Sequence, residues 1–314
     1  MAPRDRNSSK ASASSDATYT RAALEQEFPD DATCLDWLWK QNHSADGQHA
    51  MCPKCGVERK FHRVAKRASY SCDVCGHHIH PTAGTIFHKS STGLHLWFKA
   101  IFLMSSTRCG VSAKQIEREL GVTYKTAWRI ANLIRNKLMD QDDAPLDGEV
   151  EVDETMIGGK PRASEKVVRG QGSAWAADHK VATWGAVERG GRVRVKVVPH
   201  IGGLVVRGQV RKHVSPTATV FTDEAGAYTT LYREGFQHFT INHSERVYAR
   251  GNVHTQTIEG FWALVKNGIR GTHHSVSRKW LQSYLDEFAF RYNERKSAEP
   301  MFRTLLALAC RQAS

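Results

Sequence analysis

The sequence predicts a multidomain α+β protein, because its local patterns change twice along the chain. Two CxxC pairs lie in the first quarter, helical apolar periodicity follows them, and alternating patterns typical of strands begin near residue 149. A chain of 314 residues is long enough for two or three domains with cores of their own. We therefore expect a cysteine-rich module, a helical module and an α/β domain, in this order.

The chain carries a formal net charge of +12 and has a pI near 9.5. An excess of this size favours a polyanionic partner, with nucleic acid as the first candidate and an acidic membrane as the second. The sequence has no run of eighteen apolar residues and no apolar core of a signal peptide. We therefore expect a cytoplasmic protein without membrane association, so nucleic acid becomes the better partner. A protein that is merely basic is the alternative, and local motifs must decide.

The region before the cysteine pairs divides into two parts. Residues 1–18 are polar, rich in serine and alanine and without periodicity, so we expect a disordered tail. Between Thr20 and Asn42, two short helical patterns are interrupted at Pro29. They predict a small helical cap, which together with the cysteine pairs would form a module over residues 19–92.

The two CxxC pairs predict a zinc ribbon with one structural Zn²⁺. Each CxxCG string forms a tight turn that directs two thiolates to one point, and two such turns complete a tetrahedral site of four sulfur ligands. Two redox motifs are the alternative, but these would require a βαβ setting, whereas the flanking sequence predicts short strands at 60–64, 68–72 and 84–88. The expected ligands are Cys52, Cys55, Cys72 and Cys75.

The neighbouring histidines and the other cysteines are given structural interpretations. His77, His78 and His80 could bind a metal, but four cysteines already complete the site, so we expect these histidines at the surface. The remaining cysteines are expected to be small buried apolar residues, and they are Cys34, Cys109 and Cys310.

A helix-turn-helix region is expected over residues 93–140. Its pattern contains an apolar helix, a short amphipathic helix that ends before Gly121, and a longer helix for which Thr123 is a suitable N-cap. A plain helical hairpin with a glycine turn is the alternative; the adjacent zinc ribbon and the basic charge favour DNA binding. The exposed positions that suit a DNA groove and its phosphates are Tyr124, Lys125, Arg129 and Arg135.

A linker over residues 141–148 precedes a region of predicted strands and helices. The Gly-Gly pair at 190 and 191 indicates a hairpin between two of the strands. The segment 204–214 is compatible with a helix or a short strand. The expected strands are 149–159, 179–188, 192–201 and 219–222, and the expected helices are 225–234, 255–271 and 277–293.

Three acids stand at positions that could converge in this region. Asp153 lies on the first strand, Asp223 follows a later strand directly, and Glu259 lies at the edge of the apolar stripe of a predicted helix. Each acid taken alone could as well be solvated. Phosphoryl transfer by two divalent metals requires acids from separate elements, and oxygen ligands suit Mg²⁺ or Mn²⁺. Lys266 lies two helical turns beyond Glu259, too far for a helical ion pair.

Seven strings of the sequence resemble, in order, motifs of bacterial insertion-sequence transposases of the zinc-ribbon DDE kind, in the insertion-sequence-1595 family. The resemblance covers about residues 28 to 296. The strings are CPKCG…YSCDVCG, TAGTIFHKSS, LGVTYKTAWR, VDETMIGGK, VFTDEAGAY, HTQTIEGFWALVKNGIRGTHH and YLDEFAFRYN.

The resemblance implies an RNase H-like α/β catalytic core over residues 149–296, followed by a C-terminal helix at 297–314. Its three catalytic acids, which would also bind two Mg²⁺ or Mn²⁺ ions, match Asp153, Asp223 and Glu259. Thirty-five residues separate the last two, a spacing similar to that of many DDE recombinases.

Two further features of the family concern the predicted helix at 255–271. Lys266 matches a basic residue that contacts the DNA of the element ends in such enzymes. Some relatives carry an amide as the third catalytic residue, which makes Gln256 and Asn252 the reserves for Glu259.

The activity that the resemblance implies is that of a metal-dependent DNA transposase. It would bind the terminal inverted repeats of an insertion sequence, cut the DNA at the element ends and join the 3′ ends to target DNA. The partners would be double-stranded DNA and at least one further copy of the chain, in the bacterial nucleoid. The alternatives are a DNA-binding regulator with a non-catalytic RNase H-like domain and a related nuclease that cuts without joining.

Overall fold

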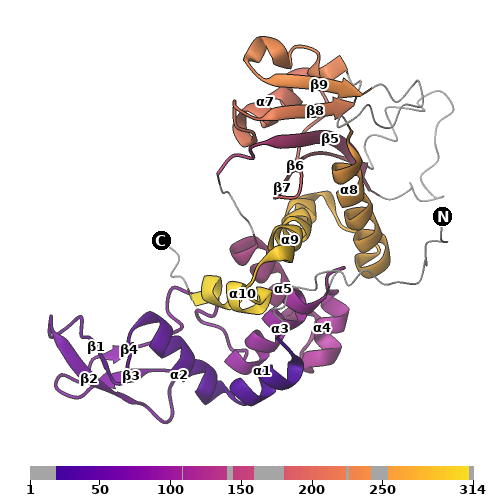
Figure 1. Cartoon of the computed structure of the whole chain (residues 1–314). Helices are drawn as coiled ribbons and strands as arrows, with labels where there is room; N and C mark the ends of the chain where they lie inside the picture. The colour runs from indigo at the N-terminus through magenta and orange to yellow at the C-terminus, as the bar shows by residue number, and fades with distance from the viewer. Residues whose placement is uncertain are drawn as a thin grey trace, which may run out of the picture. The chain divides into compact units, whose positions relative to one another are not determined.

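The computed structural model describes residues 19–107, 109–139, 144–158, 180–223, 226–241 and 254–310. The expected disordered tail, most of the first half of the expected linker, and Asn252 lie outside these residues. The chain forms two compact units (Figure 1). The first comprises the described parts of 1–106, 113–138 and 294–314, and the second those of 107–112 and 139–293.

The first unit begins with the two predicted helices, and both have an N-cap. Thr20 and Asp30 provide the N-caps: the Thr20 hydroxyl accepts from the Ala23 amide at 3.1 Å, and the Asp30 carboxylate accepts from the Thr33 amide at 2.8 Å. The helical conformation is interrupted at Pro29, between the two helices. The helices are α1 (Arg21–Glu27) and α2 (Asp31–Asn42).

A small antiparallel sheet in strand order β1-β2-β3-β4 packs against α2. Trp39 of α2 stacks on Tyr70 with 4.2 Å between ring centroids and lies 5.4 Å from the Phe61 ring. The strands are β1 (His49–Met51), β2 (Glu58–Arg63), β3 (Tyr70–Cys72) and β4 (His78–Ile79). The strand predicted at 84–88 is wrong, because these residues form turns. Thr85 favours them by donating to the Thr82 carbonyl at 2.8 Å and accepting from the Phe87 amide.

The other helices of the first unit share an aromatic core. The Phe28 ring lies 4.9 Å from that of Phe98 and 6.3 Å from that of Phe302, so the C-terminal helix packs with the N-terminal ones. Gly121 has a φ of +66° in the turn between two helices, and the Thr123 hydroxyl caps the second. The helices are α3 (Leu94–Ser106), α4 (Ala113–Leu120), α5 (Tyr124–Leu138) and α10 (Met301–Cys310).

Two expectations about exposure are wrong. Arg135 is only 1% exposed, because it lies one turn after Ala131 on the stripe of α5 that packs into the unit. Cys109 is exposed, whereas Cys34 and Cys310 are buried as predicted. We therefore exclude Arg135 from the residues that could contact DNA.

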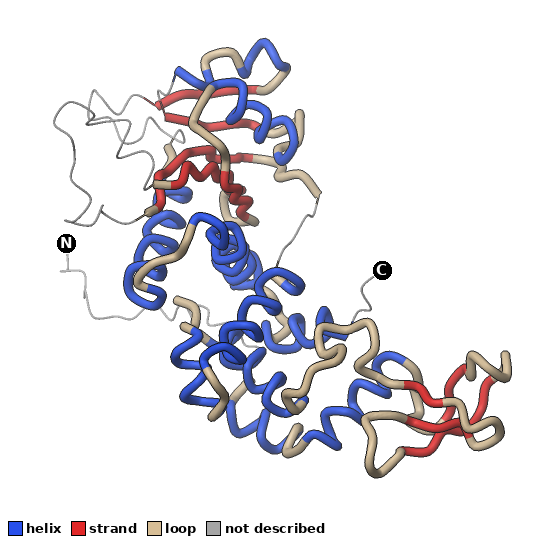
Figure 2. The backbone as a smooth tube through the Cα atoms, turned by 180° about the vertical axis from the view of Figure 1, so that it is seen from behind, coloured by secondary structure: helices blue, strands red, loops and turns tan. Residues whose placement is uncertain are grey.

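The second unit contains a five-stranded sheet in the order β7-β6-β5-β8-β9 (Figures 1 and 2). The first three strands are antiparallel, and β8 and β9 run parallel to β5. The predicted Gly-Gly hairpin joins β6 and β7: the Glu188 amide donates to the Arg192 carbonyl at 2.8 Å. The strands are β5 (Glu149–Ile157), β6 (Val181–Glu188), β7 (Val193–Val197), β8 (Thr219–Asp223) and β9 (Gln237–Ile241).

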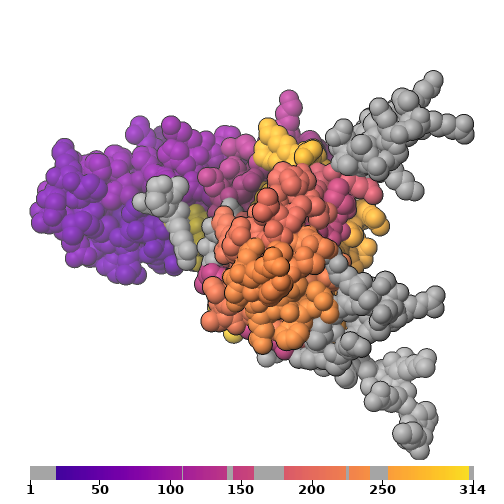
Figure 3. Space-filling view, turned by 90° about the horizontal axis from the view of Figure 1, so that it is seen from above, coloured from indigo at the N-terminus to yellow at the C-terminus, as the bar shows by residue number. Residues whose placement is uncertain are grey.

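The sequence did not predict β9, and it predicted one helix wrongly. β9 is an edge strand of the sheet and lies in the orange region of the space-filling view (Figure 3); its mixed polar sequence gives no clear alternation. In place of a helix at 225–234, the described residues form two short 3₁₀ turns, η1 (Gly226–Tyr228) and η2 (Leu231–Glu234). Short 3₁₀ pieces of this kind commonly serve as connectors.

Helices cover both faces of the five-stranded sheet. Val150 and Val152 of β5 share a core with Val206 and Val210 of α7 (Gly203–His213), so the segment 204–214 is a helix. On the opposite face, apolar residues of β6 and β7 share a core with two further helices. These are α8 (Gln256–Gly268), which a π-turn (Ile269–His273) extends, and α9 (Leu281–Asn293). None of the helices within the described ranges is long and apolar enough to cross a membrane.

A glycine on β6 lets α8 approach the sheet. Gly185 pairs with Asp153 of β5, and a Cβ placed on it would lie 2.6 Å from Cζ2 of Trp262 and 3.3 Å from Cδ1 of Ile258. Both side chains belong to the apolar stripe of α8 and are buried. α8 can therefore lie this close to the sheet beside Asp153 because Gly185 has no side chain.

We expect Gly185→Ala to lower the free energy of unfolding by about 1–3 kcal/mol, because the added methyl group overpacks the contact with Trp262. Gly260→Ala is the matched control, since a Cβ there meets nothing within 4 Å and alanine favours a helix. Urea unfolding monitored by circular dichroism measures both variants. Equal stability of Gly185→Ala and the native chain would contradict the close approach.

Candidate functional site

The four predicted zinc ligands converge in the first unit. Their Sγ atoms all lie within 4.8 Å of one another, and those of Cys52 and Cys75 are 3.6 Å apart. Four thiolates at a Zn–S distance of about 2.3 Å around a tetrahedral ion have their sulfur atoms about 3.8 Å apart. The cluster therefore fits one Zn²⁺.

Local backbone geometry explains why each CxxCG string forms half of this cluster. The amide of Gly56 donates to the Cys52 carbonyl at 2.9 Å, and the amide of Gly76 donates to the Cys72 carbonyl at 3.1 Å. Both glycines have a positive φ, +69° and +67°, which favours glycine. Two of the neighbouring histidines contact other groups and not the cysteine cluster: the ring of His78 contacts the Ser69 hydroxyl at 3.2 Å, and His80 contacts the Ala68 carbonyl.

Two of the predicted acids are neighbours across the parallel strands of the second unit. The β5–β8 pairing extends to Glu151 and Phe221, and Asp153 and Asp223 each lie two residues further along these strands. Adjacent strands lie about 4.8 Å apart, and residues opposite each other point to the same face of the sheet. The structure therefore brings together Asp153 and Asp223, which are distant in the sequence.

The third acid lies close enough to act on the first. The pKa of Asp153 is raised to about 6. Burial is the largest cause, and the negative charges of Asp223 and Glu259 also contribute. Glu259 lies in the first turn of α8, on the face of the sheet that Asp153 occupies. The three predicted acids thus form one electrostatic site, which we call the carboxylate cluster: Asp153, Asp223 and Glu259.

The carboxylate cluster is more open than the cysteine cluster. Among the described residues, the four cysteines form the group whose ligand atoms all approach within 4.8 Å, and the three acids do not meet this distance. The three acids offer hard oxygen donors, which suit small divalent cations such as Mg²⁺ or Mn²⁺.

Sequence reasoning missed Glu154, the residue after Asp153. It points to the opposite face of β5, where the hydroxyl of the buried Tyr228 donates to it. Burial raises the pKa of Glu154 to about 7, with contributions from the charges of Asp153 and Asp223. The adjacent acids in VDET could have indicated Glu154. The alternating pattern of β5, however, predicted only Val150 and Val152 on the face to which Glu154 points.

Sequence reasoning also missed how α8 is held. The fully buried carboxylate of Glu151, two residues before Asp153, accepts from the amides of Thr257 and Ile258 at 2.8 and 3.0 Å. It also accepts from the Thr257 hydroxyl at 2.9 Å. These are the orphan donors of a helix N-terminus, so a strand residue caps α8.

Arg189 completes this contact between strand and helix. Its Nε donates to the Glu151 carboxylate at 2.8 Å, and one Nη donates to the His254 carbonyl at 2.8 Å. Its guanidinium group lies 4.2 Å from the centroid of the Phe221 ring on β8. Arg189 therefore neutralises Glu151 and joins β5, β8 and the residues that precede α8.

The other predicted residues of α8 lie at distinct places. Lys266 lines a cavity of about 440 Å³ together with Arg270 and His274. Gln256 is exposed at the first position of the helix, and Asn252 lies outside the described residues. Glu259, and not Gln256, is thus the residue whose charge reaches Asp153.

Three of the four predicted DNA-contacting residues of α5 are exposed, namely Tyr124, Lys125 and Arg129. Lys114 of α4 lies over the Tyr124 ring, 5.9 Å from its centroid. Arg129 extends to Ser90, whose hydroxyl lies 3.4 Å from its Nη2 atom.

Comparisons with known proteins give a family match in the second unit and a relative that matches most of the chain. Residues 145–293 match the model of a family described as the ISXO2-like transposase domain, which is a DDE family of the insertion-sequence-1595 group. An uncharacterized protein in transposable element ISH50 of Halobacterium salinarum is 29% identical over 276 residues, covering 82% of this chain and 90% of its own. The crystal structure of a pre-cleavage Mos1 transpososome matches 64% of this chain and 75% of that chain at 13% identity. Its TM-score of 0.26 is too low to support an argument.

We expect Glu151→Ala to lower the free energy of unfolding by about 3–5 kcal/mol, because Arg189 and the two helix amides lose a buried partner. Glu149→Ala is the matched control: this acid also pairs with Arg189, at 3.1 Å, but its side chain is 44% exposed. Its effect should stay below about 1 kcal/mol. Equal effects of the two substitutions in urea unfolding would show that Glu151 does not fix α8.

Proposed function

Since residues 145–293 match the model of the ISXO2-like transposase domain, we propose that this protein is a metal-dependent DDE transposase. It binds the terminal inverted repeats of an insertion sequence, cleaves the DNA at the element ends and joins the 3′ ends to target DNA. The observation that carries this proposal is the carboxylate cluster, which lies inside the matched domain and combines acids from β5, β8 and α8.

The sheet topology supports an RNase H-like assignment for this domain. A five-stranded sheet in the order β7-β6-β5-β8-β9, with three antiparallel strands followed by two parallel ones, is the arrangement that we assign to such a core. The acids then lie on the central strand, on its parallel neighbour and on the helix across that face. The proposed domain spans residues 149–296.

The carboxylate cluster would hold two Mg²⁺ or Mn²⁺ ions. Its donors are hard oxygen atoms, and a bound cation would compensate for the burial and the neighbouring negative charges that raise the pKa of Asp153. When bound, such ions activate the attacking water or 3′ hydroxyl and stabilise the leaving oxygen. Asp153, Asp223 and Glu259 would provide the carboxylate ligands of these ions.

The remaining residues of the domain would position the nucleic acid and the helix. Lys266 and Arg270 line one cavity of the domain, and we assign them to a DNA phosphate. Glu151 and Arg189 keep Glu259 at the strand through the cap of α8. Tyr228 holds Glu154 beneath the cluster.

The first unit would supply DNA binding. Its cysteine cluster would hold one structural Zn²⁺, because four sulfur ligands leave no open coordination position for catalysis. The proposed zinc module spans residues 19–92 and the helix-turn-helix region 93–140. In the latter, Tyr124, Lys125 and Arg129 would face the duplex. Joining two element ends requires at least two copies of the chain.

A strand-transfer assay with labelled terminal-repeat duplex and Mg²⁺ tests the function. We expect Asp153→Asn, Asp223→Asn and Glu259→Gln each to reduce joining by about 1000-fold or more, because each removes a metal ligand. Gln256→Ala is the control and should retain most of the activity. Binding without cutting would identify a regulator, and cutting without joining a nuclease. Activity that survives Glu259→Gln and is lost in Gln256→Ala would move the third ligand to Gln256.

Metal binding should stabilise the protein in a pH-dependent way. In the metal-free protein, the pKa of Asp153 is raised to about 6 and that of Glu154 to about 7. Both groups therefore favour folding most at a pH below their ordinary pKa of about 4. That contribution is lost as the pH rises through 6 to 7. Because the cations bind carboxylates, Mg²⁺ or Mn²⁺ should raise the melting temperature more at about pH 8 than at about pH 5.

Differential scanning fluorimetry measures this increase in melting temperature. Asp153→Asn should remove most of it, whereas Lys212→Ala, an exposed change on α7, should preserve it. The same stabilisation at both pH values would show that the ions bind elsewhere.

A further inference from the structure

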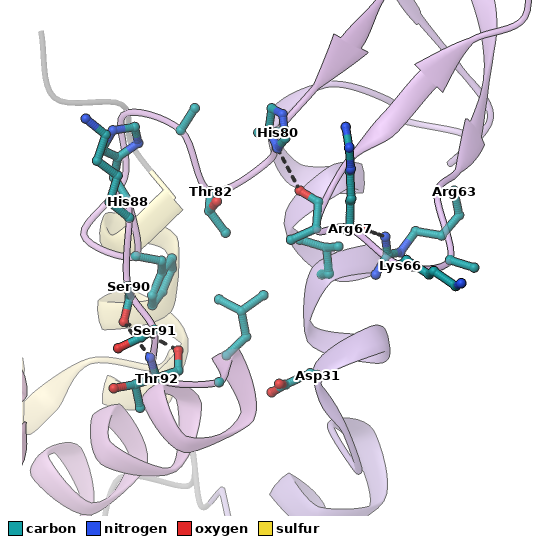
Figure 4. Close-up of a pocket in the computed structure, with 18 residues that line it drawn as sticks. Asp31, Arg63, Lys66, Arg67, His80, Thr82, His88, Ser90, Ser91 and Thr92 are labelled. Carbon is teal, nitrogen blue, oxygen red and sulfur yellow. Dashed lines mark hydrogen bonds between the residues drawn. The ribbon is translucent and has the colours of Figure 1, made fainter. Parts of the chain in front are cut away.

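A cleft of about 620 Å³ lies in the first unit, between the sheet of the cysteine module and the segment that leads into α3 (Figure 4). Figure 4 shows Arg63, Lys66 and Arg67 along one side of the hollow, and His88 and Ser90 along the other. The proposed catalytic chemistry makes no use of these residues, and they lie outside the helix-turn-helix positions named above.

The charges that line this cleft are strongly unbalanced. Arg63, Lys66, Arg67 and Lys89 are permanently positive, and Asp31 is the one acid among the lining residues. The Asp31 carboxylate accepts from the His95 amide at 2.8 Å, so it caps the start of α3. Its negative charge is thus already balanced in part by the positive end of a helix.

The loop along the first side is held rigid while its cations stay exposed. Arg63 donates through Nη1 to the Val64 carbonyl at 2.8 Å and also to the carbonyls of Arg67 and Ser69. The Ala68 carbonyl lies 3.2 Å from Nδ1 of His80. Within the described residues, the side chains of Lys66 and Arg67 form no hydrogen bond or ion pair, and both residues are exposed.

The second side is also preformed and connects to α5. Lys89 is exposed and has a φ of +53°, an uncommon conformation for a residue other than glycine. The Ser90 hydroxyl next to it accepts from the Trp97 indole at 2.9 Å and lies 3.4 Å from Nη2 of Arg129. Ser90 therefore links the edge of the cleft to Arg129 on the exposed face of α5.

We propose that this cleft binds the phosphodiester backbone of duplex DNA. The inference rests on the proposed function and adds to it a second contact surface beside α5. The cations lie exposed on both sides of an open cleft and do not converge on one buried point, which suits a chain of phosphates better than a single small anion. Arginine and lysine contacts to phosphates position the duplex without reading its sequence.

The side chains that line this cleft are suited to phosphate contacts. Because arginine and lysine can also pair with guanine edges, a comparison of two duplex sequences separates positioning from base reading. The hydroxyls of Ser91 and Thr92 are suitable phosphate donors. The cleft should therefore strengthen binding to terminal-repeat and unrelated duplexes alike.

Fluorescence anisotropy over a salt series tests this proposal, with the full-length zinc-loaded protein and two duplexes, one a terminal repeat and one of unrelated sequence. The triple variant Lys66→Ala, Arg67→Ala, Lys89→Ala should reduce the slope of log affinity against log salt by about 3, since each phosphate contact contributes about 0.9. Affinity for both duplexes should fall on the order of 100-fold at about 0.15 M salt.

Controls separate the cleft from the overall charge and from the fold. Lys212→Ala removes an exposed cation of α7 in the second unit and should leave the slope unchanged. Unchanged zinc content and circular dichroism would show that the triple variant is folded. If it is not, the single changes Lys66→Ala and Lys89→Ala provide the same test, each with a loss of about fivefold.

Three results would overturn the proposal. An unchanged slope in a cleft variant, with DNA binding by the native protein, would reject the cleft and leave the proposed function standing. A loss confined to the terminal-repeat duplex would mean that the cleft reads sequence. Failure of the native protein to bind either duplex would reject both the cleft and the proposed function.

Discussion

The arrangement of the carboxylate cluster depends on one buried carboxylate, that of Glu151. Moving a carboxylate out of water costs several kcal/mol unless hydrogen bonds and an opposite charge compensate for it. Here two amides and a hydroxyl of α8, together with Arg189, provide that compensation. Any rotation of α8 about its axis would break these bonds. The contact that compensates for the burial of Glu151 therefore also fixes the orientation of α8, which carries Glu259.

The sheet beneath this contact concentrates negative charge where the helix is most tightly held. Asp153, Glu154 and Asp223 lie within two adjacent strands, and burial raises the pKa of the first two. A protein selected for stability alone would avoid such crowding, whereas a site that binds cations needs it. The close approach of Trp262 to Gly185 keeps α8 on the sheet despite this repulsion.

The features that the sequence predicted are those encoded by short spacings. The CxxCG turns, the Gly-Gly hairpin and the cap at Thr123 are local, so their geometry follows from a few residues. The three acids could be chosen as candidates because each stands at a recognisable place, within or at the end of a strand or in the first turn of a helix. The strand register then brings the two aspartates together.

The features that the sequence did not predict depend on tertiary partners. Nothing in the local pattern distinguishes Glu151 from a solvated strand residue, because its partners come from a distant helix. Arg135 carries the charge expected of a DNA contact, but it occupies the buried stripe of α5, and its neighbours decide its exposure. β9 has little apolar alternation of its own and forms because β8 offers a free edge.

The cap of α8 also determines when the carboxylate cluster can form during folding. Glu151 and Thr257 are 106 residues apart, so this contact closes a long loop and forms only after the central strand and the crossover through α7 are in place. During synthesis, a ribosome-bound chain that has not yet reached α8 holds two of the acids and lacks the third. The complete carboxylate cluster therefore arises late, when nearly the whole domain has been made.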